Sequence, residues 1–356
     1  MLFDHESFDA HENVVFAHEP ASGLKAIIAL HSTALGPAAG GCRLWRYDDD
    51  RAALADVLRL SRGMTYKNAL AGLPLGGGKC VILAPPEIAD RTALFAALGR
   101  AIDRLGGAYW TAEDVGVSPA DLAAVAGSTR FVAGLDEGRH ASGDPSPVTA
   151  RGVFVCLLAG AERLWGRRDL SDLTVGVQGL GHVGWHLCGL LRGAGAELLV
   201  TDLAMERCQA AAETFAAKVV APEALLGAPM DIFAPCALGG VLTERSVAAL
   251  QARLICGSAN NQLGDDRAAA ALAASGKLYL PDYVVNAGGI VNVASEILGI
   301  ARPGWVEEKL AGLASTIERV IDLAARDGGN TAAVADALAR QRIESARTAA
   351  ASATAA

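Results

Sequence analysis

The stretch TVGVQGLGHVG, residues 174–184, decides the fold class of the chain. Gly179, Gly181 and Gly184 form a GxGxxG motif between an apolar, strand-like run and the start of a helix-like segment. The first glycine permits a tight turn, the second lets the backbone approach a pyrophosphate, and the third allows close packing of helix and strand. The N–H groups and the dipole of the helix then face the phosphates. The motif therefore predicts a dinucleotide site at a strand–turn–helix unit.

Asp202 ends the next apolar run, ELLVTD, where dinucleotide-binding folds place an acidic residue. Its carboxylate accepts hydrogen bonds from the ribose hydroxyls of adenosine and repels a 2′-phosphate, so we expect NAD rather than NADP. Arg207 is near in sequence and offers a partner for a 2′-phosphate, which leaves NADP as an alternative. The other interpretation, a glycine-rich turn without a ligand, does not account for this aspartate.

Short apolar runs alternate with helix-like segments through the second half of the chain. The runs are TVGVQ, ELLVTD, DIFAP, RLICGSA and LYLPD. Short strands that are apolar throughout are typical of a parallel sheet covered on both faces. We therefore predict a Rossmann-type, doubly wound domain, followed by helices near residues 306–326 and 331–346.

The first half of the chain has a mixed pattern of strands and helices. Residues 24–30 and 80–85 are strand-like, whereas residues 51–71 and 91–105 carry apolar side chains at helical spacing. The pattern indicates a mixed α/β domain rather than a second parallel sheet.

A length of 356 residues suits two domains better than one core. ASGDPSPVTA, residues 141–150, is rich in turn formers and fits the connection between them. The predicted fold class is α/β: an N-terminal mixed α/β domain at residues 1–140 and a Rossmann-type dinucleotide-binding domain at residues 141–329, with a cleft between the two.

Composition and charge exclude several classes of protein. The net charge of −8 gives no electrostatic footprint for nucleic acid or an anionic membrane. No apolar run reaches the roughly 18 residues that span a bilayer, and the first residues, MLFDHESFDAHE, are unlike a secretory leader. The seven cysteines are odd in number and scattered, which favours reduced thiols in a cytoplasmic protein.

The glycine run in GLPLGGGKC, residues 72–80, first suggests a phosphate loop. The Walker A pattern needs G-x-x-x-x-G-K-[ST], and this chain has Leu73 at the leading glycine position and Cys80 in place of the metal-binding hydroxyl. The phosphate-loop interpretation therefore fails at two required positions.

The alternative is that Lys79, which follows the glycine run, is itself a catalytic residue. Lys67 supplies a second cation and Asp114, in the strand-like YWTAEDVG, supplies a carboxylate. A second cation in an apolar cleft favours the free amine of a lysine, which can then act as a base. Two lysines and a carboxylate suit amino-acid deamination, in which one cation grips the α-carboxylate and an amine activates water. On these residues alone, two surface lysines and a turn aspartate remain the favoured interpretation.

Longer motifs, in collinear order from about residue 13 to about residue 345, resemble the Glu/Leu/Phe/Val dehydrogenases, and best their leucine dehydrogenase branch. The motifs are GLKAIIALHSTALGPAAGG, LSRGMTYKNALAGLPLGGGK, TAEDVG, DPSPVTA, VQGLGHVG, DIFAPCALGG, GSANNQL and PDYVVNAGGIVNVASE. The resemblance implies an NAD-dependent L-amino-acid dehydrogenase, with Lys79 as the catalytic lysine and Asp114 as its proton-transfer partner. It also implies that Lys67 binds the substrate α-carboxylate together with the backbone of Gly40 and Gly41.

The resemblance also implies a side-chain pocket that is apolar. Glutamate-specific relatives use a lysine and a serine where this chain has Ala39 and Val293, and burying an unpaired carboxylate costs on the order of several kcal/mol. Leucine is therefore favoured, with valine and isoleucine, and glutamate is disfavoured. Ala39 departs from the leucine that leucine dehydrogenases carry and widens the pocket, so phenylalanine is the first alternative and a non-catalytic NAD-binding sensor the second. The implied substrate-binding residues beyond the lysine and the glycines are Ala39, Met64, Ala112, Asn261, Ile290 and Val293.

The cofactor residues follow from the glycine motif and the resemblance together. They are Thr149, Gly179, Leu180, Gly181, His182, Val183, Gly184, Asp202, Leu203, Cys236, Ala237, Ala259, Asn260 and Asn286. His182 and His186 have a spacing that can ligate a metal, but no further ligand is evident and no metal is expected. The resemblance further implies a homo-oligomer, octamer or dimer, and a C-terminal helix at residues 330–356 that returns to the first domain.

Overall fold

A computed structural model describes residues 2–135 and 141–354, and the chain forms two compact units. Unit 1 comprises Met1–Pro145, Ile290–Trp305 and Ala339–Ala356, and unit 2 comprises Ser146–Gly289 and Val306–Leu338. The sequence placed Ile290–Trp305 in the second domain, whereas in the structure this segment belongs to unit 1.

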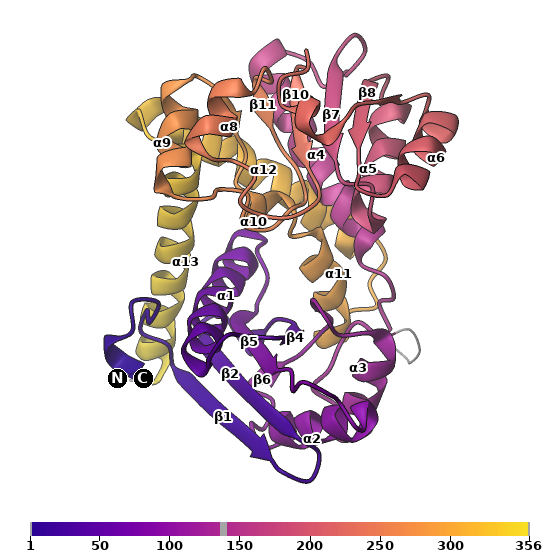
Figure 1. Cartoon of the computed structure of the whole chain (residues 1–356). Helices are drawn as coiled ribbons and strands as arrows, with labels where there is room; N and C mark the ends of the chain where they lie inside the picture. The colour runs from indigo at the N-terminus through magenta and orange to yellow at the C-terminus, as the bar shows by residue number, and fades with distance from the viewer. Residues whose placement is uncertain (1, 136–140, 355–356) are drawn as a thin grey trace. The chain divides into compact units, whose positions relative to one another are not determined.

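Within the described residues, unit 1 contains a six-stranded mixed sheet in the order β1-β2-β5-β3-β6, and β4 also pairs with β5 (Figure 1). β1 and β2, and β2 and β5, are antiparallel, whereas β3 and β4 run parallel to β5. The elements are η1 (Leu2–Asp4), β1 (Asn13–Glu19), β2 (Leu24–Ser32), β3 (Ala38–Ala39), β4 (Cys42–Trp45), α1 (Asp50–Leu70), β5 (Gly76–Leu83), α2 (Arg91–Asp103), β6 (Tyr109–Trp110), α3 (Pro119–Ala126) and α11 (Gly288–Ile297).

Helices cover both faces of this sheet. The face toward α1 is lined by Ile27, Ala29 and Val81, and the face toward α2 and α3 by Ile28, Cys80 and Ile82. Because side chains alternate along a strand, Lys79 shares the α1 face with Val81. The mixed α/β character predicted for the first half is confirmed, and both predicted helices begin within a residue of the predicted positions.

The glycine run Gly76–Gly78 is the first part of β5, so this strand begins four residues before the predicted strand at Cys80. A Cβ atom added to the three glycines would lie 2.1 Å from Ser32 O, 2.0 Å from Thr65 N and 2.8 Å from Tyr109 Cδ2, in that order. Such distances are impossible for real side chains, so α1, β2 and β6 approach the strand as closely as they do only because it carries no side chains here.

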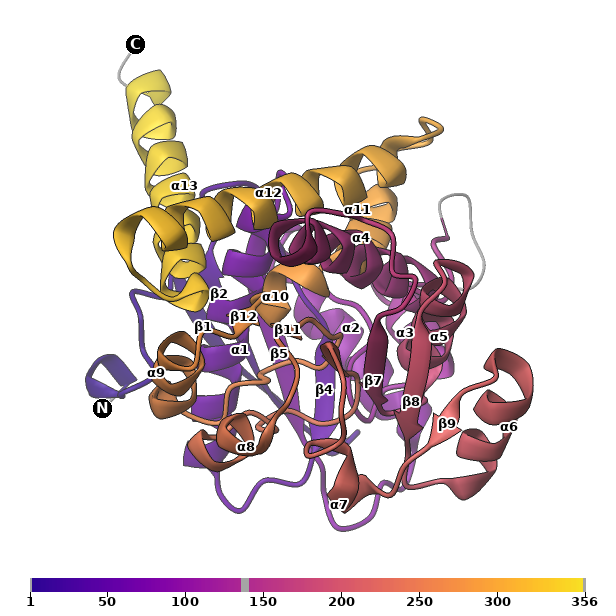
Figure 2. The ribbon, with the colours of Figure 1, turned by 90° about the horizontal axis from the view of Figure 1, so that it is seen from above.

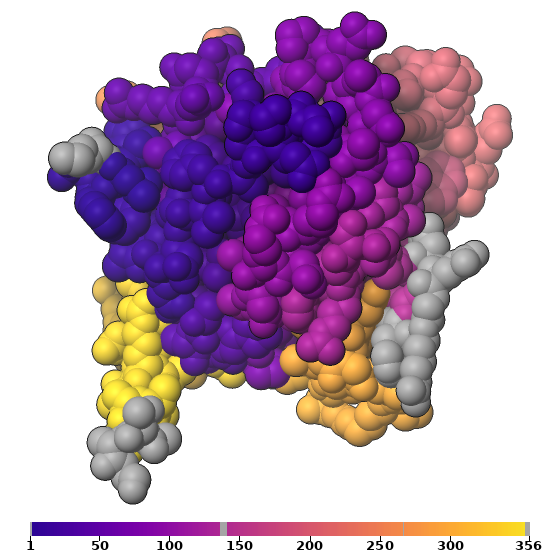
Figure 3. Space-filling view, turned by 90° about the horizontal axis from the view of Figure 1, so that it is seen from below, coloured from indigo at the N-terminus to yellow at the C-terminus, as the bar shows by residue number. Residues whose placement is uncertain are grey.

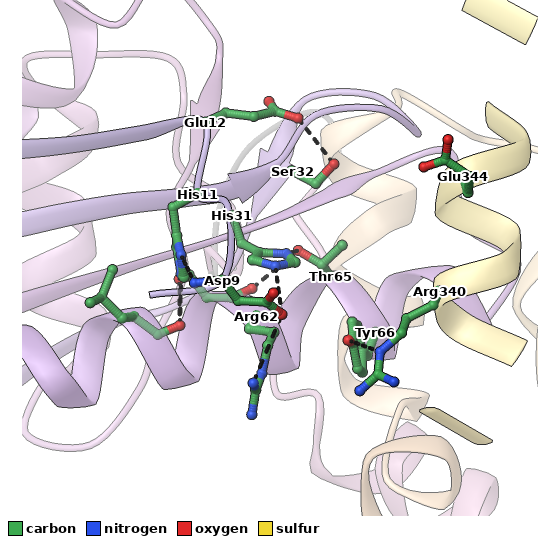
Figure 4. A network of polar contacts seen from close by, with 12 residues as sticks. Asp9, His11, Glu12, His31, Ser32, Arg62, Thr65, Tyr66, Arg340 and Glu344 are labelled. Atoms are coloured by element: carbon green, nitrogen blue, oxygen red, sulfur yellow. Dashed lines mark hydrogen bonds and ion pairs between the residues drawn. The ribbon is translucent and has the colours of Figure 1, made fainter. Parts of the chain in front are cut away.

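A polar network holds α1 in place over the glycine run (Figure 4). The hydroxyl of Thr65 lies 3.2 Å from Ser61 O and forms a hydrogen bond of 2.9 Å with His31 Nδ1. Burial and the neighbouring His11 lower the pKa of His31 to about 4, which keeps its imidazole neutral. An uncharged histidine of β2 therefore holds Thr65 by a hydrogen bond.

The C-terminal helix α13 (Thr331–Thr354) begins in unit 2, and its residues from Ala339 belong to unit 1. Arg340 Nε donates to the hydroxyl of Tyr66 at 2.9 Å, which ties this part of the helix to α1 (Figure 4). Asp9 and Ala10 of the N-terminal segment line a pocket together with Arg340 and Glu344 from the middle of α13, whereas the end of this helix, in yellow in Figure 3, extends away from the indigo segments. The helix is eight residues longer than predicted, because its alanine-rich end has high helix propensity.

Unit 2 contains a six-stranded sheet, within the described residues, in the order β12-β11-β10-β7-β8-β9, and every pair in it is parallel. Figure 2 shows α5 and α6 beside β7, β8 and β9. The elements are α4 (Ser146–Trp165), β7 (Thr174–Gln178), α5 (His182–Gly193), β8 (Glu197–Thr201), α6 (Met205–Phe215), β9 (Lys218–Val219), α7 (Pro222–Leu225), β10 (Ile232–Pro235), α8 (Glu244–Ala249), β11 (Leu254–Ile255), α9 (Asp266–Ala274), β12 (Leu278–Tyr279), α10 (Asp282–Val285) and α12 (Trp305–Asp327).

The strand order of unit 2 is that of a doubly wound dinucleotide-binding sheet, with the order reversing between β7 and β10. All five predicted strands are present, and Phe233 and Ile255 pack against α7, α8 and α9 on one face. Leu254 lies on the other face, against Gly160 of α4. The predicted Rossmann-type sheet is confirmed. In the described part of the chain, every helix is too short or too polar to cross a bilayer.

Gly77→Ala is expected to lower the free energy of unfolding by about 3 kcal/mol or more, because its Cβ would collide with the backbone of α1. Gly63→Ala is the control, since Gly63 lies within α1 and an added Cβ meets nothing within 4 Å. Alanine there should stabilise the protein by up to about 1 kcal/mol. Denaturant midpoints measure both effects, and a Gly77→Ala protein as stable as the wild type would contradict the close packing.

Candidate active site

An interruption of the sheet places two glycines opposite Lys79. β3 pairs with β5 as far as Gly77 and β4 resumes the pairing at Cys80, so Gly40 and Gly41 lie in the gap between β3 and β4. Gly40 N–H donates to Trp110 O at 3.2 Å, whereas the described residues show no acceptor for Gly41 N–H. One backbone donor is thus available in the gap.

Neither glycine in the gap has room for a side chain. A Cβ on Gly40 would lie 1.9 Å from Gly78 O, and a Cβ on Gly41 would lie 2.6 Å from Glu113 O. The same added atom on Gly41 would lie 2.9 Å from Asp114 Cβ. The glycine at position 41 is therefore what allows Asp114 to approach the end of the glycine run.

Lys79 and Asp114 form a buried ion pair, with Nζ 2.7 Å from Oδ2. The lysine side chain is 8% exposed and the aspartate side chain 19% exposed. Burial by itself would raise the pKa of Asp114, but the ammonium of Lys79 and the guanidinium of Arg43 outweigh it and hold that pKa below its usual range. Asp114 is therefore a carboxylate at neutral pH. It lies in the loop after β6, not in a strand as its strand-like surroundings suggested.

Lys67 lies half-buried in the last turn of α1. Met64, three residues earlier, faces the gap, because its Cγ would lie 3.0 Å from a Cβ on Gly40. Residues three apart share a helix face, so Lys67 lies on the side of α1 that faces the gap. Ala39 is fully buried in β3 and Ala112 is half-buried just after β6. The structure thus places Met64 beside the glycine gap, and helical spacing puts Lys67 on the same side of α1.

Ile290 and Val293 lie on α11 and are both buried. The polar contacts of this helix are with the segment after β6: Glu296 accepts from Gly134 N at 2.7 Å, and Asn292 donates to Ser142 O at 2.9 Å. These contacts fix the helix within unit 1. The position of the two side chains in the substrate pocket stays a prediction.

The glycine motif of unit 2 has the geometry that dinucleotide binding requires. Gly179 has a φ of +99°, in the left-handed region, and a Cβ on Gly184 would lie 2.0 Å from Gly179 O. A Cβ on Gly181 would meet nothing within 4 Å. The protein itself therefore requires the first and third glycines, whereas the open space at Gly181 fits a phosphate at the N-terminus of α5.

Asp202 follows β8 and is directed back to the glycine motif. Its carboxylate accepts from Leu180 N at 2.6 Å and from Ala204 N at 2.9 Å. Arg207 lies 3.9 Å from it with an exposed side chain. The aspartate is thus held next to the glycine turn, where a ribose would follow the pyrophosphate.

Asn286 carries a buried acceptor that has no partner among the residues the structure describes. Its Nδ2 donates to Asn260 Oδ1 at 2.8 Å and to Ser258 O at 3.1 Å, while its Oδ1 has none. Such an atom demands a donor from a ligand or from water. A carboxamide N–H of a nicotinamide has this chemistry, so the open glycine and the orphaned acceptor both fit a dinucleotide.

The other predicted cofactor residues surround the same strand ends. Ala237 contacts Gly179, Cys236 N donates to Gln178 O at 2.7 Å, and Ala259 N donates to Pro235 O at 2.9 Å. Leu203 is 94% exposed next to Asp202, and Asn261 has a left-handed φ of +52°. The remaining positions are Thr149 in the first turn of α4, and His182 and Val183 at the start of α5.

Two further side chains near Lys79 were missed by sequence reasoning. Tyr109, fully buried, donates its hydroxyl to Gly40 O at 2.8 Å, and Arg43 Nε donates to Asp114 Oδ2 at 3.2 Å. Arg43 is separated from the glycine pair only by Cys42, and this proximity is the only sequence signal for it. Among the described residues no group of three His, Cys, Asp or Glu side chains could hold a metal, and His182 and His186 are exposed.

Comparisons with known proteins identify the family of the chain. Residues 11–131 match the family described as Glu/Leu/Phe/Val dehydrogenase, dimerisation domain, and residues 199–351 match Glutamate/Leucine/Phenylalanine/Valine dehydrogenase. The chain is 47% identical to leucine dehydrogenase of Bacillus cereus over 340 residues, which cover 96% of this chain and 92% of that protein. It is 45% identical to valine dehydrogenase of Streptomyces virginiae over 346 residues, 96% of each chain.

A solved structure is similar over almost the whole chain. The crystal structure of L-tryptophan dehydrogenase from Nostoc punctiforme has a TM-score of 0.84 and 39% identity, covering 95% of this chain and 97% of that one. The fold and the site define an α/β dehydrogenase of the dinucleotide-binding class. The chain belongs to the Glu/Leu/Phe/Val dehydrogenase family.

Gly181→Ala separates ligand binding from folding. An added Cβ meets no protein atom, so the free energy of unfolding should change by less than about 1 kcal/mol. The same methyl group would occupy the space of a phosphate, so the dissociation constant for NADH should rise about tenfold or more.

Gly189→Ala on the same helix is the matched control, because its Cβ would make only an ordinary contact with Phe215. Titration of NADH fluorescence measures the affinity of each variant. Equal NADH affinity of Gly181→Ala and Gly189→Ala would contradict the assignment of the phosphate position.

Proposed function

We propose that this chain catalyses the reversible, NAD-dependent oxidative deamination of branched-chain L-amino acids. In this reaction an L-amino acid, NAD⁺ and water give a 2-oxo acid, ammonium, NADH and a proton. Leucine is the favoured substrate, with valine and isoleucine. The single observation that carries the proposal is the buried pair of Lys79 and Asp114 beside a backbone gap formed by glycines.

The relatives support the choice of substrate. Those named above are a leucine and a valine dehydrogenase at 47% and 45% identity. Ala39, Met64 and Ala112 give the site apolar surroundings. A glutamate side chain would leave its carboxylate unpaired there, at a cost on the order of several kcal/mol.

Each residue of unit 1 has one task in the proposed mechanism. The ammonium of Lys67 and the free N–H of Gly41 hold the substrate α-carboxylate. When bound, the dinucleotide supplies a hydride acceptor for the α-carbon. Once the ammonium proton of Lys79 has passed to Asp114, at 2.7 Å, its free amine removes a proton from the water that attacks the substrate imine and gives a carbinolamine. A proton is then returned to the amino nitrogen and the carbinol hydroxyl loses its proton to the base, so that the C=O bond forms, the C–N bond breaks and ammonia leaves.

NAD is the proposed dinucleotide because a carboxylate occupies the ribose position. Asp202 is held by two backbone N–H groups, so its charge stays beside the glycine turn. A 2′-phosphate would be repelled at that point. Arg207, exposed and 3.9 Å from this carboxylate, is the residue that would bind a 2′-phosphate if NADP were used instead.

We further propose that the protein is a homo-oligomer, octamer or dimer, and acts in the cytoplasm. The first matched family segment is described as a dimerisation domain. The seven cysteines are free and six of them are buried, which suits a compartment that keeps thiols reduced. In this proposal unit 1 carries the catalytic groups and unit 2 the dinucleotide.

Lys79→Ala is expected to lower kcat for leucine oxidation by about 10³-fold or more, because the base that activates water is lost. NADH affinity should stay within about twofold of the wild type, since Lys79 belongs to unit 1 and the glycine motif to unit 2. Lys25→Ala is the control, because Lys25 is exposed in β2 of the same sheet.

The readout is NADH absorbance with leucine and NAD⁺ at alkaline pH. Wild-type protein that binds NADH but oxidises no apolar amino acid would favour the non-catalytic sensor. Residual activity of Lys79→Ala near that of Lys25→Ala would remove Lys79 from the mechanism.

A panel of amino acids tests the pocket. We expect kcat/KM to decrease from leucine to valine and phenylalanine, and to be lowest for glutamate. Because Ala39 enlarges the pocket and one methylene changes discrimination by only about 1–3 kcal/mol, the aliphatic substrates should differ by less than about 100-fold. Tryptophan belongs in the panel because one relative is a tryptophan dehydrogenase. A phenylalanine-to-leucine ratio above about ten would show that Ala39 dominates the choice.

A further inference from the structure

Arg43 contacts the candidate catalytic carboxylate without being part of the proposed chemistry. It lies on β4 in register with Val81, so it shares the α1 face of the sheet with Lys79. Its Nε donates to Asp114 Oδ2 at 3.2 Å, the same oxygen that Lys79 Nζ contacts at 2.7 Å. Two cations from neighbouring strands therefore converge on one carboxylate oxygen.

Asp56, on α1, holds Arg43 from the other side. Arg43 Nη1 donates to Asp56 Oδ2 at 2.8 Å, and the hydroxyl of Tyr47 donates to the same oxygen at 2.8 Å. Arg59 Nη2 donates to Asp56 Oδ1 at 3.0 Å. The side chains of Arg43 and Asp56 are 21% and 13% exposed, so water competes little for these bonds. The guanidinium is thus held at both ends.

We propose that Arg43 is a positioning residue that fixes the orientation and the charge of Asp114 for proton exchange with Lys79, and that Asp56 in turn aligns Arg43. The inference rests on the proposed function, because it concerns how the same carboxylate works. The substrate does not touch Arg43 in this scheme. Its effect passes through Asp114 alone.

The geometry gives Arg43 a task that Lys79 cannot perform. A lysine ammonium is a point charge on a flexible stem, whereas a guanidinium is planar and donates in fixed directions. Lys79 must also change partners during the reaction, when its nitrogen turns to water. At that moment the bond from Arg43 still holds Oδ2 of Asp114 in place, so the carboxylate stays within reach of the amine.

The other interpretation is that Arg43 and Asp56 form an ion pair that only stabilises the fold. Both interpretations predict some loss of stability when Arg43 is replaced. They differ in the pH dependence of turnover, because only a residue that acts on Asp114 changes the proton affinity of the Asp114–Lys79 pair.

Arg43→Gln should lower kcat for leucine oxidation about tenfold or more and leave KM for leucine within about threefold. The ascending limb of the kcat/KM pH profile should move to higher pH by about half a unit or more, because loss of a neighbouring cation makes the pair hold its proton more tightly. Arg43→Lys keeps the positive charge but loses the planar guanidinium. The ascending limb of its pH profile should therefore stay near the wild-type position, whereas its kcat should be lower than that of the wild type.

Asp56→Asn should affect the pH profile differently from Arg43→Gln. It leaves Arg43 in the chain but weakens its alignment, so kcat should fall by about threefold or more. Because a negative charge is removed, the ascending limb should not move to higher pH. Arg100→Gln is the matched control, since Arg100 pairs with Glu19 across α2 and β1 in the same unit. It should change neither kcat nor the limb.

The proposal would be overturned if Arg43→Gln kept both the wild-type kcat and the wild-type position of the ascending limb of the pH profile. An unchanged kcat in Asp56→Asn would overturn it as well. Should Arg43→Gln not fold, Arg43→Lys and Asp56→Asn provide the same test. Hydrogen exchange of the peptide that spans residues 111–117 supplies a readout independent of turnover, and it should be faster in Arg43→Gln than in Arg100→Gln. Wild-type protein without any turnover would sink the proposed function, whereas equal exchange in the two variants would sink the role of Arg43.

Discussion

A lysine ammonium under a helix, on the covered face of a sheet, can exist only next to a carboxylate. In unit 1 this constraint is met by Asp114, 2.7 Å from Lys79. Removing one partner of such a buried pair costs about 3–5 kcal/mol, so the surroundings are built to keep both. The loop after β6 brings the carboxylate in, and the absence of a side chain at Gly41 leaves it room. The break between β3 and β4 then leaves one backbone donor beside the pair.

Glycine serves two different purposes in the two units. In unit 1 the run Gly76–Gly78 allows close packing within the protein. The backbone of α1 and the ring of Tyr109 occupy the space that side chains at these positions would need. In unit 2 no protein atom packs against Gly181 where its side chain would be, and this space is open. The same residue type thus compacts one site and keeps the other accessible. This contrast explains why a glycine run before a lysine is not a phosphate loop here.

The sequence predicted the second unit more completely than the first. The five strands predicted for unit 2 are mostly apolar and buried, and the roles of Gly179, Gly181 and Gly184 follow from local geometry, which a motif records. The sixth, β9, consists of two exposed residues and was not predicted. The start of β5 at Gly76 was missed because glycine has low strand propensity. Contacts between strands that are distant in sequence leave a weaker signal: Arg43 and Tyr109 reach the site because β4 pairs with β5 and β6 with β3, which no local pattern encodes. The exchange of Ile290–Trp305 between domains was missed for the same reason.

The close packing around the glycines also limits how this protein can diversify. A side chain at position 40, 41, 76 or 77 would collide with backbone, and one at position 78 would collide with the buried ring of Tyr109. Larger side chains at these glycine positions can therefore not be used to make the site smaller for a new substrate. If the proposed pocket holds the substrate side chain, variation in unit 1 is left to positions such as Ala39, Met64 and Ala112, which already carry side chains that can change in size. A family built on this arrangement would keep its reaction constant while its substrates change, and its members would differ first at such positions.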